Sequence, residues 1–307
     1  MNENEEKING NNVESTEPEL KRVSFSQYSI YLKCPHKWEL DYVKDLREKD
    51  STIHTTFGTA IHHAIQTFLH VHFGNISDIN PEDKRPNAQK YYDVFVEKFK
   101  EEFQTITTEV HEGDFDNFCK DGKNILTEVL KPANVKQYFS KSEFELIGIE
   151  VPLNIKLINN VEFVGFIDVV LKYKGENKYK IIDIKTSGSG WTKYQKESPE
   201  KYVQLHLYKH VYSKKFNVNE NDIDVEFFIV RRNIDNKYGK TSRIQLYAPP
   251  SRFKDIKESI NNFVDFLNEG FTPDGNYQTK SFIKNPGYND KNCKYCIYYK
   301  NQCDAKN

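Results

Sequence analysis

Long apolar segments and export signals are both missing from this sequence of 307 residues. A membrane-spanning helix needs a run of about 18 or more apolar residues, and no such run occurs. The first twenty residues are acidic and contain no apolar stretch, whereas a secretory signal requires one. We therefore expect a cytoplasmic protein that has no membrane partner.

Cysteine is also scarce, with five residues in the whole chain. Because no export signal is present, these cysteines are better explained as reduced thiols or metal ligands than as a disulfide framework. A chain of this length, in which 37% of the residues are hydrophobic and 14% aromatic, can bury a core of its own. Such a core makes disulfide cross-links unnecessary for folding.

Charge is distributed unevenly along the chain. Residues 1–20 contain six Glu and one Lys, so a total net charge of −1 leaves +4 on the other 287 residues. A mildly basic body permits a nucleic-acid partner without requiring one. Because the acidic segment lacks aromatic residues, we expect residues 1–22 to form a disordered tail and residues 23–307 to form the folded domain.

Hydrophobic periodicity divides the folded part into three regions. A 3.6-residue period predicts helices at about 57–73, 86–105 and 114–139, within a helical segment over about 57–140. The period then changes to two and predicts antiparallel strands at 144–158, 161–173 and 179–184, with a turn at Asn159-Asn160. The sheet core extends over about 144–247 and also includes a helix at 198–215 and strands at 223–231 and 242–247. A C-terminal region, 251–307, begins with an amphipathic helix at 252–268. We therefore expect a mixed α/β (α+β) domain.

Two aspartates lie in apolar strands of this sheet. Asp168 is flanked by Ile167 and Val169, and Asp183 lies in Ile-Ile-Asp-Ile-Lys-Thr at the end of the next strand. Burying a carboxylate among apolar residues costs free energy unless a cation neutralises it. Strand periodicity puts Lys185 on the same face as Asp183, so the acid could hold Mg²⁺ while the ammonium reaches the same phosphate or its attacking water. A surface ion pair is the alternative for an isolated Asp-x-Lys, but the apolar flanks and the second acid argue against it.

Three further side chains are candidates for the same site. Gln204 and Tyr208 lie four residues apart on the following helix, hence on one face, and could hydrogen-bond a phosphate or a water. His62, one turn after Gly58 on an early helix, could bind a divalent metal as neutral imidazole. A single helical histidine is more often a partly buried core residue, and the adjacent His63 leaves the choice of ligand open.

These residues occur in an order that resembles a known nuclease family. It resembles the RecB-like branch of the PD-(D/E)XK nuclease superfamily, which includes the RecB and AddB nuclease domains, the CRISPR-associated RecB-like exonucleases and mitochondrial exonuclease V. The resemblance extends over about residues 24–303 and implies a restriction-endonuclease-like core, in which helices flank a mixed central sheet. The motifs are Gly58-Thr-Ala-Ile-His62, Glu150, Gly165-Phe-Ile-Asp168, Asp183-Ile-Lys185-Thr186 and Gln204-x-x-x-Tyr208.

The resemblance implies a metal-dependent deoxyribonuclease and a role for each site residue. Lys185 would position and polarise the attacking water, and Glu150 would support a second metal or that water. Ile167 replaces the proline that the family often has before the first aspartate, a change that is common in this branch. Gln204 and Tyr208 would contact the DNA backbone, and the catalytic Mg²⁺ or Mn²⁺ would be held by His62, Asp168, Asp183 and the carbonyl of Ile184.

The cysteines form a second candidate site. Cys293, Cys296 and Cys303 are close in sequence but leave a tetrahedral site one ligand short, and Cys34 is the natural fourth ligand. A site of four cysteines would attach the N-terminal helices to the C-terminal tail. Iron-sulfur members of the family place one cysteine before the histidine motif and three after the nuclease core, so the resemblance implies a [4Fe-4S] cluster. Zn²⁺ and free thiols are the alternatives, and Cys119 has no partner in the sequence.

The expected function is therefore hydrolysis of DNA by an exonuclease, in recombination, repair or phage DNA metabolism. DNA that is single-stranded or has free ends is the expected substrate, and no small-molecule substrate is expected. A CRISPR-adaptation nuclease that trims DNA for integration is one alternative. A non-catalytic iron-sulfur subunit that binds DNA or assists assembly is another, and the intact set of His62, Asp168, Asp183 and Lys185 argues against it.

Basic residues and one glycine-containing segment give further indications. Tyr238-Gly-Lys-Thr241 resembles the end of a phosphate-binding loop, but the required first glycine is absent and a strand follows it. We therefore expect no fused helicase motor, and a separate helicase or recombination partner could supply unwound DNA. The residues proposed for phosphate contacts are Lys33, Lys37, Arg231 and Arg232.

Overall fold

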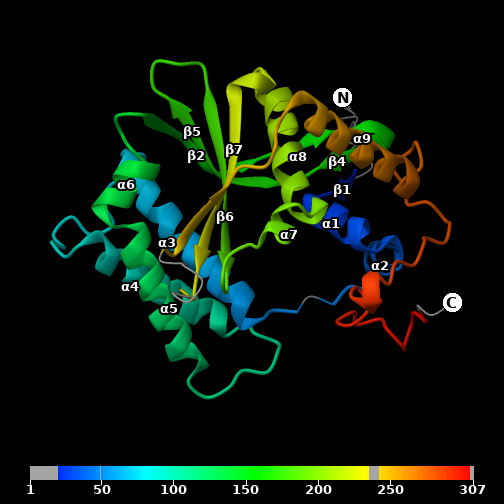
Figure 1. Ribbon diagram of the computed structural model, residues 1–307, viewed down its shortest axis with the longest axis horizontal. Helices are drawn as coiled ribbons and strands as arrows, with labels where there is room; N and C mark the ends of the chain where they lie inside the picture. The colour runs from blue at the N-terminus through cyan, green and yellow to red at the C-terminus, as the bar shows by residue number, and fades with distance from the viewer. Residues whose placement is uncertain (1–19, 49, 235–241, 305–307) are drawn as a thin grey trace, which may run out of the picture.

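A five-stranded mixed sheet forms the centre of the protein (Figure 1). The computed structural model describes residues 20–48, 50–234 and 242–304. Along the sheet the strands follow the order β2-β5-β6-β7-β8, in which β6 and β7 pair in parallel and the other pairs are antiparallel. The strands are β2 (Phe144–Pro152), β5 (Phe166–Tyr173), β6 (Tyr179–Ser187), β7 (Ile223–Arg231) and β8 (Ile244–Tyr247).

A second, three-stranded sheet divides two of the expected strands. The segment between β2 and β5 leaves the main sheet and forms β3 and β4, which pair with the N-terminal β1 in the order β1-β4-β3. Asn159 and Asn160 make the expected turn between β3 and β4, both with positive φ. Lys21 and Arg22 belong to β1, so the end of the segment expected to be a disordered tail is instead a strand. The three strands are β1 (Lys21–Val23), β3 (Ile155–Lys156) and β4 (Val161–Phe163).

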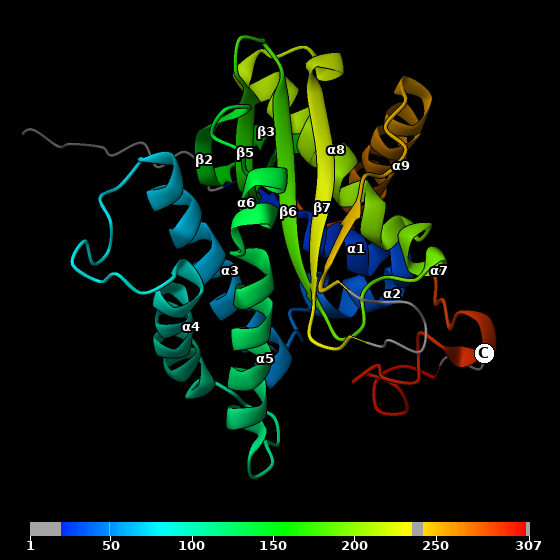
Figure 2. The same ribbon diagram turned by 60° about the vertical axis from the view of Figure 1, so that its left-hand side comes forward.

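Four helices cover one face of the main sheet (Figure 2). Aromatic rings fill the space between them, and Phe57, Phe95, Phe99 and Phe118 contact one another edge-on or stacked. The expected helix at 114–139 is divided at Pro132, because proline has no N–H to donate and its ring clashes with the preceding turn. The helices are α3 (Ile53–Phe73), α4 (Asn87–Phe103), α5 (Asp114–Val129) and α6 (Pro132–Tyr138).

Three helices belong to the core on the opposite face of the sheet. Ser24 caps the first of them, because its side chain accepts a hydrogen bond from the backbone N–H of Gln27. The rings of Tyr28, Phe263 and Phe266 pack together where the first and last helices meet. The three helices are α1 (Phe25–Lys33), α8 (Pro199–Phe216) and α9 (Phe253–Gly270).

The N-terminal helices lie beside the C-terminal segment (Figure 1). Trp38, which follows α1, contacts the rings of Phe266, Phe271 and Phe282 from the C-terminal part. Across the described ranges, no helix is long and apolar enough to cross a bilayer. The remaining short elements are α2 (Pro35–Trp38), the π-helix η1 (Glu39–Val43), α7 (Lys193–Lys196), and the 3-10 turns η2 (Ile158–Asn160), η3 (Glu220–Asp222) and η5 (Tyr288–Asp290).

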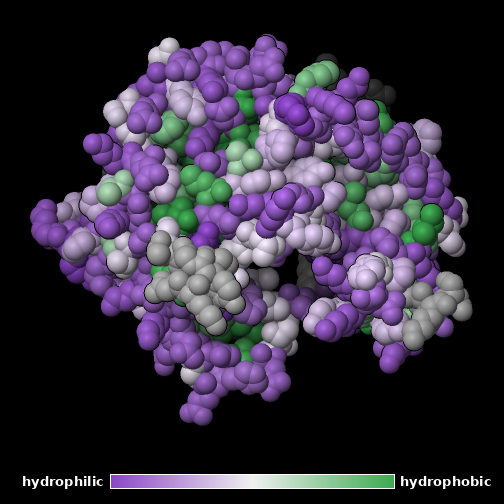
Figure 3. All heavy atoms as spheres, in the orientation of Figure 1, coloured by the Kyte–Doolittle hydropathy of each residue, from purple (hydrophilic) through white to green (hydrophobic). Residues whose placement is uncertain are grey.

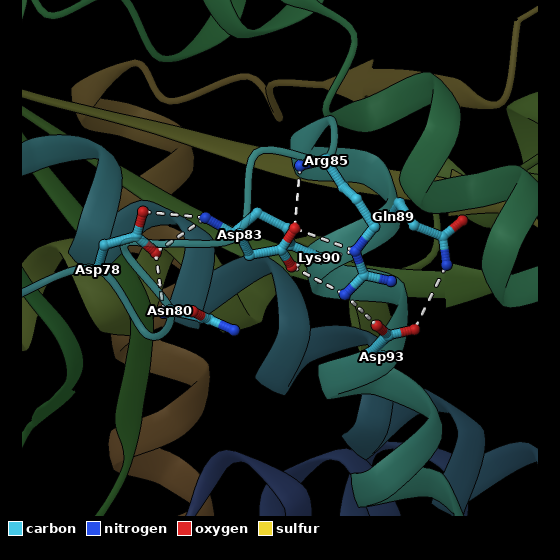
Figure 4. Close-up of polar contacts among 7 residues, drawn as sticks. All are labelled: Asp78, Asn80, Asp83, Arg85, Gln89, Lys90 and Asp93. Carbon is cyan, nitrogen blue, oxygen red and sulfur yellow. Dashed lines mark hydrogen bonds and ion pairs between the residues drawn. The ribbon is translucent and has the colours of Figure 1, made fainter.

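Ion pairs hold the connection between α3 and α4 (Figure 4). Lys90 on α4 is buried, and its ammonium lies 2.9 Å from Oδ2 of Asp78. The guanidinium of Arg85 lies 2.8 Å from Asp83 and 2.7 Å from Asp93. Hydrogen bonds from Arg85 lower the pKa of Asp83 to about 2, so this carboxylate stays ionised at ordinary pH. These charges hold the loop between α3 and α4.

Candidate active site

Three carboxylates lie side by side across three adjacent strands. The register of β2 against β5 places Glu150 opposite Asp168, between paired residues on either side. In the pairing of β5 with β6, Val169 lies opposite Ile182. The next pair in the same register is Asp168 and Asp183. Side chains directly opposite in antiparallel strands point to the same face of a sheet. The sheet therefore brings these three acids together, although they are far apart in sequence.

His62 reaches this group from α3. Its Nδ1 lies 3.6 Å from Oδ2 of Asp168, and the same oxygen accepts a 2.7 Å hydrogen bond from the backbone N–H of Ile184. Burial, and then the positive charge of Lys185, lower the pKa of His62 to about 4, although a hydrogen bond with the Ile184 backbone acts in the opposite direction. The imidazole is therefore neutral at physiological pH, which is the form that binds metals.

Lys185 and Asp183 form an ion pair on β6. Nζ of Lys185 lies 2.7 Å from Oδ2 of Asp183, whose side chain is 2% exposed. Oδ1 of Asp183 accepts a 2.8 Å hydrogen bond from Nε2 of Gln204, which also donates to the hydroxyl of Tyr208 over 3.1 Å. Gln204 and Tyr208 lie one turn apart on α8, so this helix supplies the polar group that fixes the buried carboxylate.

Gln66 also belongs to the site, although none of the sequence motifs includes it. It is buried on α3, one turn after His62, and its Nε2 donates a 2.6 Å hydrogen bond to Oε1 of Glu150. The spacing of four residues from His62 puts both side chains on one helix face. That spacing is the sequence signal that could have identified Gln66.

Lys185 offsets only part of the cost of burying the charges of Asp168 and Asp183. Burial, and then the charge of Asp183, raise the pKa of Asp168, although Lys185 lowers it. Burial also raises the pKa of Asp183, against the lowering effect of Lys185. For Lys185 itself, burial lowers the pKa, but the carboxylates of Asp183 and Asp168 outweigh burial and the pKa is raised. The lysine therefore remains an ammonium within an electronegative site.

The donor chemistry fits a hard divalent cation. In the part of the chain that the structure describes, Oδ2 of Asp183 is buried without a hydrogen bond and has the ammonium of Lys185 as its ion-pair partner. Carboxylate oxygens, a backbone carbonyl and a neutral imidazole are ligands that Mg²⁺ or Mn²⁺ accepts, and a cation would offset the charge of Asp168 and Asp183. Within residues 20–48, 50–234 and 242–304, no three His, Cys, Asp or Glu side chains are grouped closely enough to hold a metal by themselves.

The four cysteines proposed as ligands line one small cavity. Cys34 lies between α1 and α2, whereas Cys293, Cys296 and Cys303 come from the C-terminal segment. Burial raises the pKa of Cys293, and negative charge on the other three sulfurs raises it further. Cys119 lies elsewhere, buried in the aromatic core on α5.

The basic residues proposed for phosphate contacts differ in their surroundings. The ammonium of Lys37 pairs with Asp41 at 2.9 Å and also lies over the ring of Tyr298. Arg231 donates a 3.3 Å hydrogen bond to the carbonyl of Ser242. Arg232 lines a pocket that His62 and Lys185 also line. The segment 238–241, which was compared with a phosphate-binding loop, lies outside the described residues.

Comparison with known proteins assigns the family. A crystal structure of a protein from Eubacterium rectale, provisionally described as an exonuclease, is similar with a TM-score of 0.48 and 11% sequence identity over 86% of each chain. No curated protein matches the sequence significantly. The family model of the PD-(D/E)XK nuclease superfamily matches residues 22–304 and confirms the mixed α/β fold expected from the sequence. This chain therefore belongs to the PD-(D/E)XK nuclease superfamily.

Proposed function

We propose that the protein is a Mg²⁺- or Mn²⁺-dependent deoxyribonuclease that removes nucleotides from DNA ends. The observation that carries the proposal is the alignment of Glu150, Asp168 and Asp183 across adjacent strands, with Lys185 paired to Asp183 at 2.7 Å. Membership of a nuclease superfamily supports the hydrolytic reaction. In this reaction water attacks phosphorus, and the bond from phosphorus to the departing nucleoside oxygen breaks.

His62, Asp168, Asp183 and the carbonyl of Ile184 would hold the metal. When bound, the metal supplies Lewis-acid polarisation of the phosphate and lowers the pKa of a coordinated water. The ammonium of Lys185 directs positive charge toward the attacking water or the scissile phosphate. The hydrogen bond from Gln204 keeps Asp183 oriented on one side, and that from Gln66 holds Glu150 on the other.

The RecB-like assignment and the iron-sulfur cluster are part of the same proposal. The cavity lined by Cys34, Cys293, Cys296 and Cys303 supports a four-cysteine site, and the resemblance to iron-sulfur nucleases favours [4Fe-4S] over Zn²⁺. A DNA recombination, repair or phage pathway, and a helicase partner that supplies DNA ends, follow from the same resemblance. Such a cluster would tie the N-terminal helices to the C-terminal segment.

The first test uses the full-length protein, purified without oxygen, with end-labelled single- and double-stranded DNA in Mg²⁺ or Mn²⁺. We expect the wild type to shorten DNA from an end and Lys185→Ala to reduce kcat at least about 100-fold, because a fixed charge at the reacting phosphate is lost. Asp183→Asn should have a similar effect. Lys156→Ala, which removes an exposed lysine of β3, is the matched control and should leave kcat unchanged.

Two outcomes would contradict the proposal. One is a wild type that binds DNA but does not cleave it in any divalent metal, which would favour a non-catalytic binding subunit. The other is a Lys185→Ala protein that folds and retains wild-type kcat. Thermal unfolding of each variant shows whether a loss of activity reflects a loss of structure.

A further inference from the structure

A pocket adjoins the candidate active site at the beginning of α3. Its walls are the first turns of α3, the end of β6 and the residue that follows β7, and it shares His62 and Lys185 with the active site. In the space-filling view, the face of the molecule is hollowed below α7, next to the beginning of α3 (Figure 3). The pocket is therefore continuous with the candidate active site.

Arg232 supplies a charged side chain to this pocket, and the main sheet holds its backbone. Its backbone N–H donates a 2.9 Å hydrogen bond to the carbonyl of Ser187, which extends the pairing of β7 with β6 beyond the strand end. Lys185 lies two residues before Ser187 on the same strand. The position of Arg232 relative to the catalytic lysine is therefore fixed by sheet geometry.

The helical segment holds the guanidinium of Arg232. Its central carbon lies 4.0 Å from the centre of the Phe118 ring, and its Nε lies 3.7 Å from Oδ2 of Asp121. Both partners come from α5. A guanidinium stacked on an aromatic face loses little conformational freedom when it binds a ligand.

One donor of Arg232 lacks a hydrogen bond. In the described chain, Nη1 is buried and has no acceptor, and the distance of 3.7 Å to Asp121 is too long for a hydrogen bond from Nε. A buried donor without an acceptor costs free energy, and more so when it carries charge. This donor belongs to a cation that lines the pocket, so an anionic ligand in the pocket would be favoured.

Gly58 on α3 also lines the pocket. A Cβ atom at this position would lie 3.1 Å from Oγ1 of Thr186, which is tighter than ordinary contact. The absence of a side chain lets α3 approach β6 closely. Gly58 and Thr186 both line the pocket, together with Arg232, Lys185 and His62.

We propose that this pocket binds a backbone phosphate of the DNA strand next to the scissile phosphate, with Arg232 as the phosphate-binding residue. The proposal rests on the proposed nuclease function and extends it to how the DNA strand is positioned along the site. A guanidinium can form two parallel hydrogen bonds with a phosphate, which fixes orientation as well as charge. The helical segment thus contributes to the site by holding Arg232 through Phe118 and Asp121.

The test compares Arg232→Gln with Arg252→Gln in the full-length protein. Arg252 is an exposed arginine before α9 that pairs with Asp255 three residues later, so its variant removes the same charge elsewhere. Loss of one charge-assisted contact should raise KM for DNA about tenfold in Arg232→Gln, with little change in kcat. The salt dependence of binding should correspond to about one phosphate contact fewer. Arg252→Gln should match the wild type in both.

A chemical substitution locates the contact. Single methylphosphonates, which are uncharged, are placed in turn at each phosphate flanking the cleavage site. The wild type and Arg252→Gln should lose affinity at one flanking position, and Arg232→Gln should lose nothing further there. If Arg232→Gln retains the wild-type sensitivity at every position, the inference is wrong.

Failure of the inference can be distinguished from failure of the proposed function. If the wild type cleaves no DNA, the proposed nuclease function is wrong, and the affinity for DNA in Ca²⁺ then judges Arg232 alone. Equal affinity and equal salt dependence of the wild type and Arg232→Gln would overturn the phosphate pocket. Equal melting temperatures of the variants would show that neither substitution acts through unfolding.

Discussion

At the scale of single residues, the backbone of Glu150 is unusual for a strand. Its φ is 50°, in the left-handed region that residues other than glycine adopt at a cost of about 1–2 kcal/mol. The side chain of the same residue receives the 2.6 Å hydrogen bond from Gln66 and lies opposite Asp168 in the sheet. Strained backbone of this kind is concentrated at functional sites, where it orients a side chain.

Substitution of Glu150 separates backbone strain from the carboxylate. Glu150→Gly and Glu150→Ala both remove the carboxylate, but only glycine tolerates the left-handed conformation without a steric cost. We expect Glu150→Gly to be more stable than Glu150→Ala by about 0.5–1 kcal/mol, the reverse of the usual order in a strand. Urea unfolding measures the difference, and an alanine variant at least as stable as the glycine variant would show that the backbone is not strained.

At the scale of elements, the approach of α4 to α5 depends on one small residue. Gly122 on α5 is covered by the ring of Phe95 on α4, and a Cβ atom at Gly122 would overlap that ring. Phe95 in turn stacks on Phe99 and contacts Phe57 on α3. The close contact therefore joins three helices of the segment that carries Phe118, the partner of Arg232.

Gly122→Ala tests this contact. Alanine favours a helix by about 1 kcal/mol relative to glycine, but here the overlap with Phe95 forces rotamer or backbone shifts of about 1–3 kcal/mol. We expect a net loss of stability, measured as a lower urea midpoint. Asn117→Ala, on the exposed side of the same helix, is the control and should stabilise the protein by a few tenths of a kcal/mol. Stabilisation by Gly122→Ala would mean that the two helices can separate freely.

The contact between α8 and α9 contains a buried histidine. Nε2 of His206 donates a 2.9 Å hydrogen bond to the carbonyl of Pro250, which leaves Nδ1 to accept the hydroxyl of Ser259 at 2.7 Å. This pattern requires the neutral ring, because a protonated Nδ1 could not accept. Burial lowers the pKa of His206, although the Pro250 hydrogen bond and Asp255 act in the opposite direction.

His206 therefore makes stability depend on pH. Because its folded pKa lies below the unfolded value of about 6.5, the unfolded chain takes up the proton first as the pH falls, and stability decreases below about pH 6.5. Glutamine does not titrate, so His206→Gln should lose less free energy of unfolding between pH 7.5 and 5.5 than the wild type. His111→Gln, at an exposed histidine, should lose as much as the wild type. Parallel losses in all three proteins would exclude this role for His206.

At the scale of the whole molecule, the C-terminal segment closes onto the N-terminal helices. Nδ2 of Asn292 donates a 3.0 Å hydrogen bond to the carbonyl of Lys33, and the hydroxyl of Tyr298 donates a 2.7 Å hydrogen bond to Asp41. The backbone N–H of Phe282 donates a 3.1 Å hydrogen bond to Glu39. These contacts span most of the sequence, and Asn292 and Tyr298 also line the cavity of the four cysteines. A metal bound there would therefore add to the attachment of the two ends.

The proposed four-cysteine cluster predicts that removal of one of its cysteines loosens this closure. We expect Cys34→Ser and Cys293→Ser to lose iron together and to lower the melting temperature by about 5 °C or more, because metal binding contributes directly to folding free energy. Cys119→Ala is the control. Burial raises the pKa of Cys119 to about 11, so it remains a neutral thiol, and its variant should keep full iron content. Iron measured by colorimetry in each anaerobic preparation decides the matter, and zinc in place of iron would remove the cluster from the proposal.

Local pattern alone determined much of this protein. The period of two placed Asp183 and Lys185 on one face, and the expected strand at 223–231 coincides with β7. The helix at 198–215 matches α8 within one residue at each end, and Pro132 divides the helix expected at 114–139. The strand and the helix depend on residues close in sequence, for which spacing and propensity carry the information. The undivided helix expected at 114–139 was wrong, because the periodicity was followed across Pro132 although proline interrupts a helix.

Tertiary structure alone decided the rest. The pairing of β1 with β4, the hydrogen bond from Gln66 to Glu150, and the stacking of Arg232 on Phe118 join segments far apart in the chain. No periodicity specifies such pairs, because each depends on how whole helices and strands dock. The sequence by itself therefore determined which side chains could act as acids, bases and ligands. Only the packing of α3, α5 and α8 against the sheet decided which of them meet, because burial and charge act between neighbours in space.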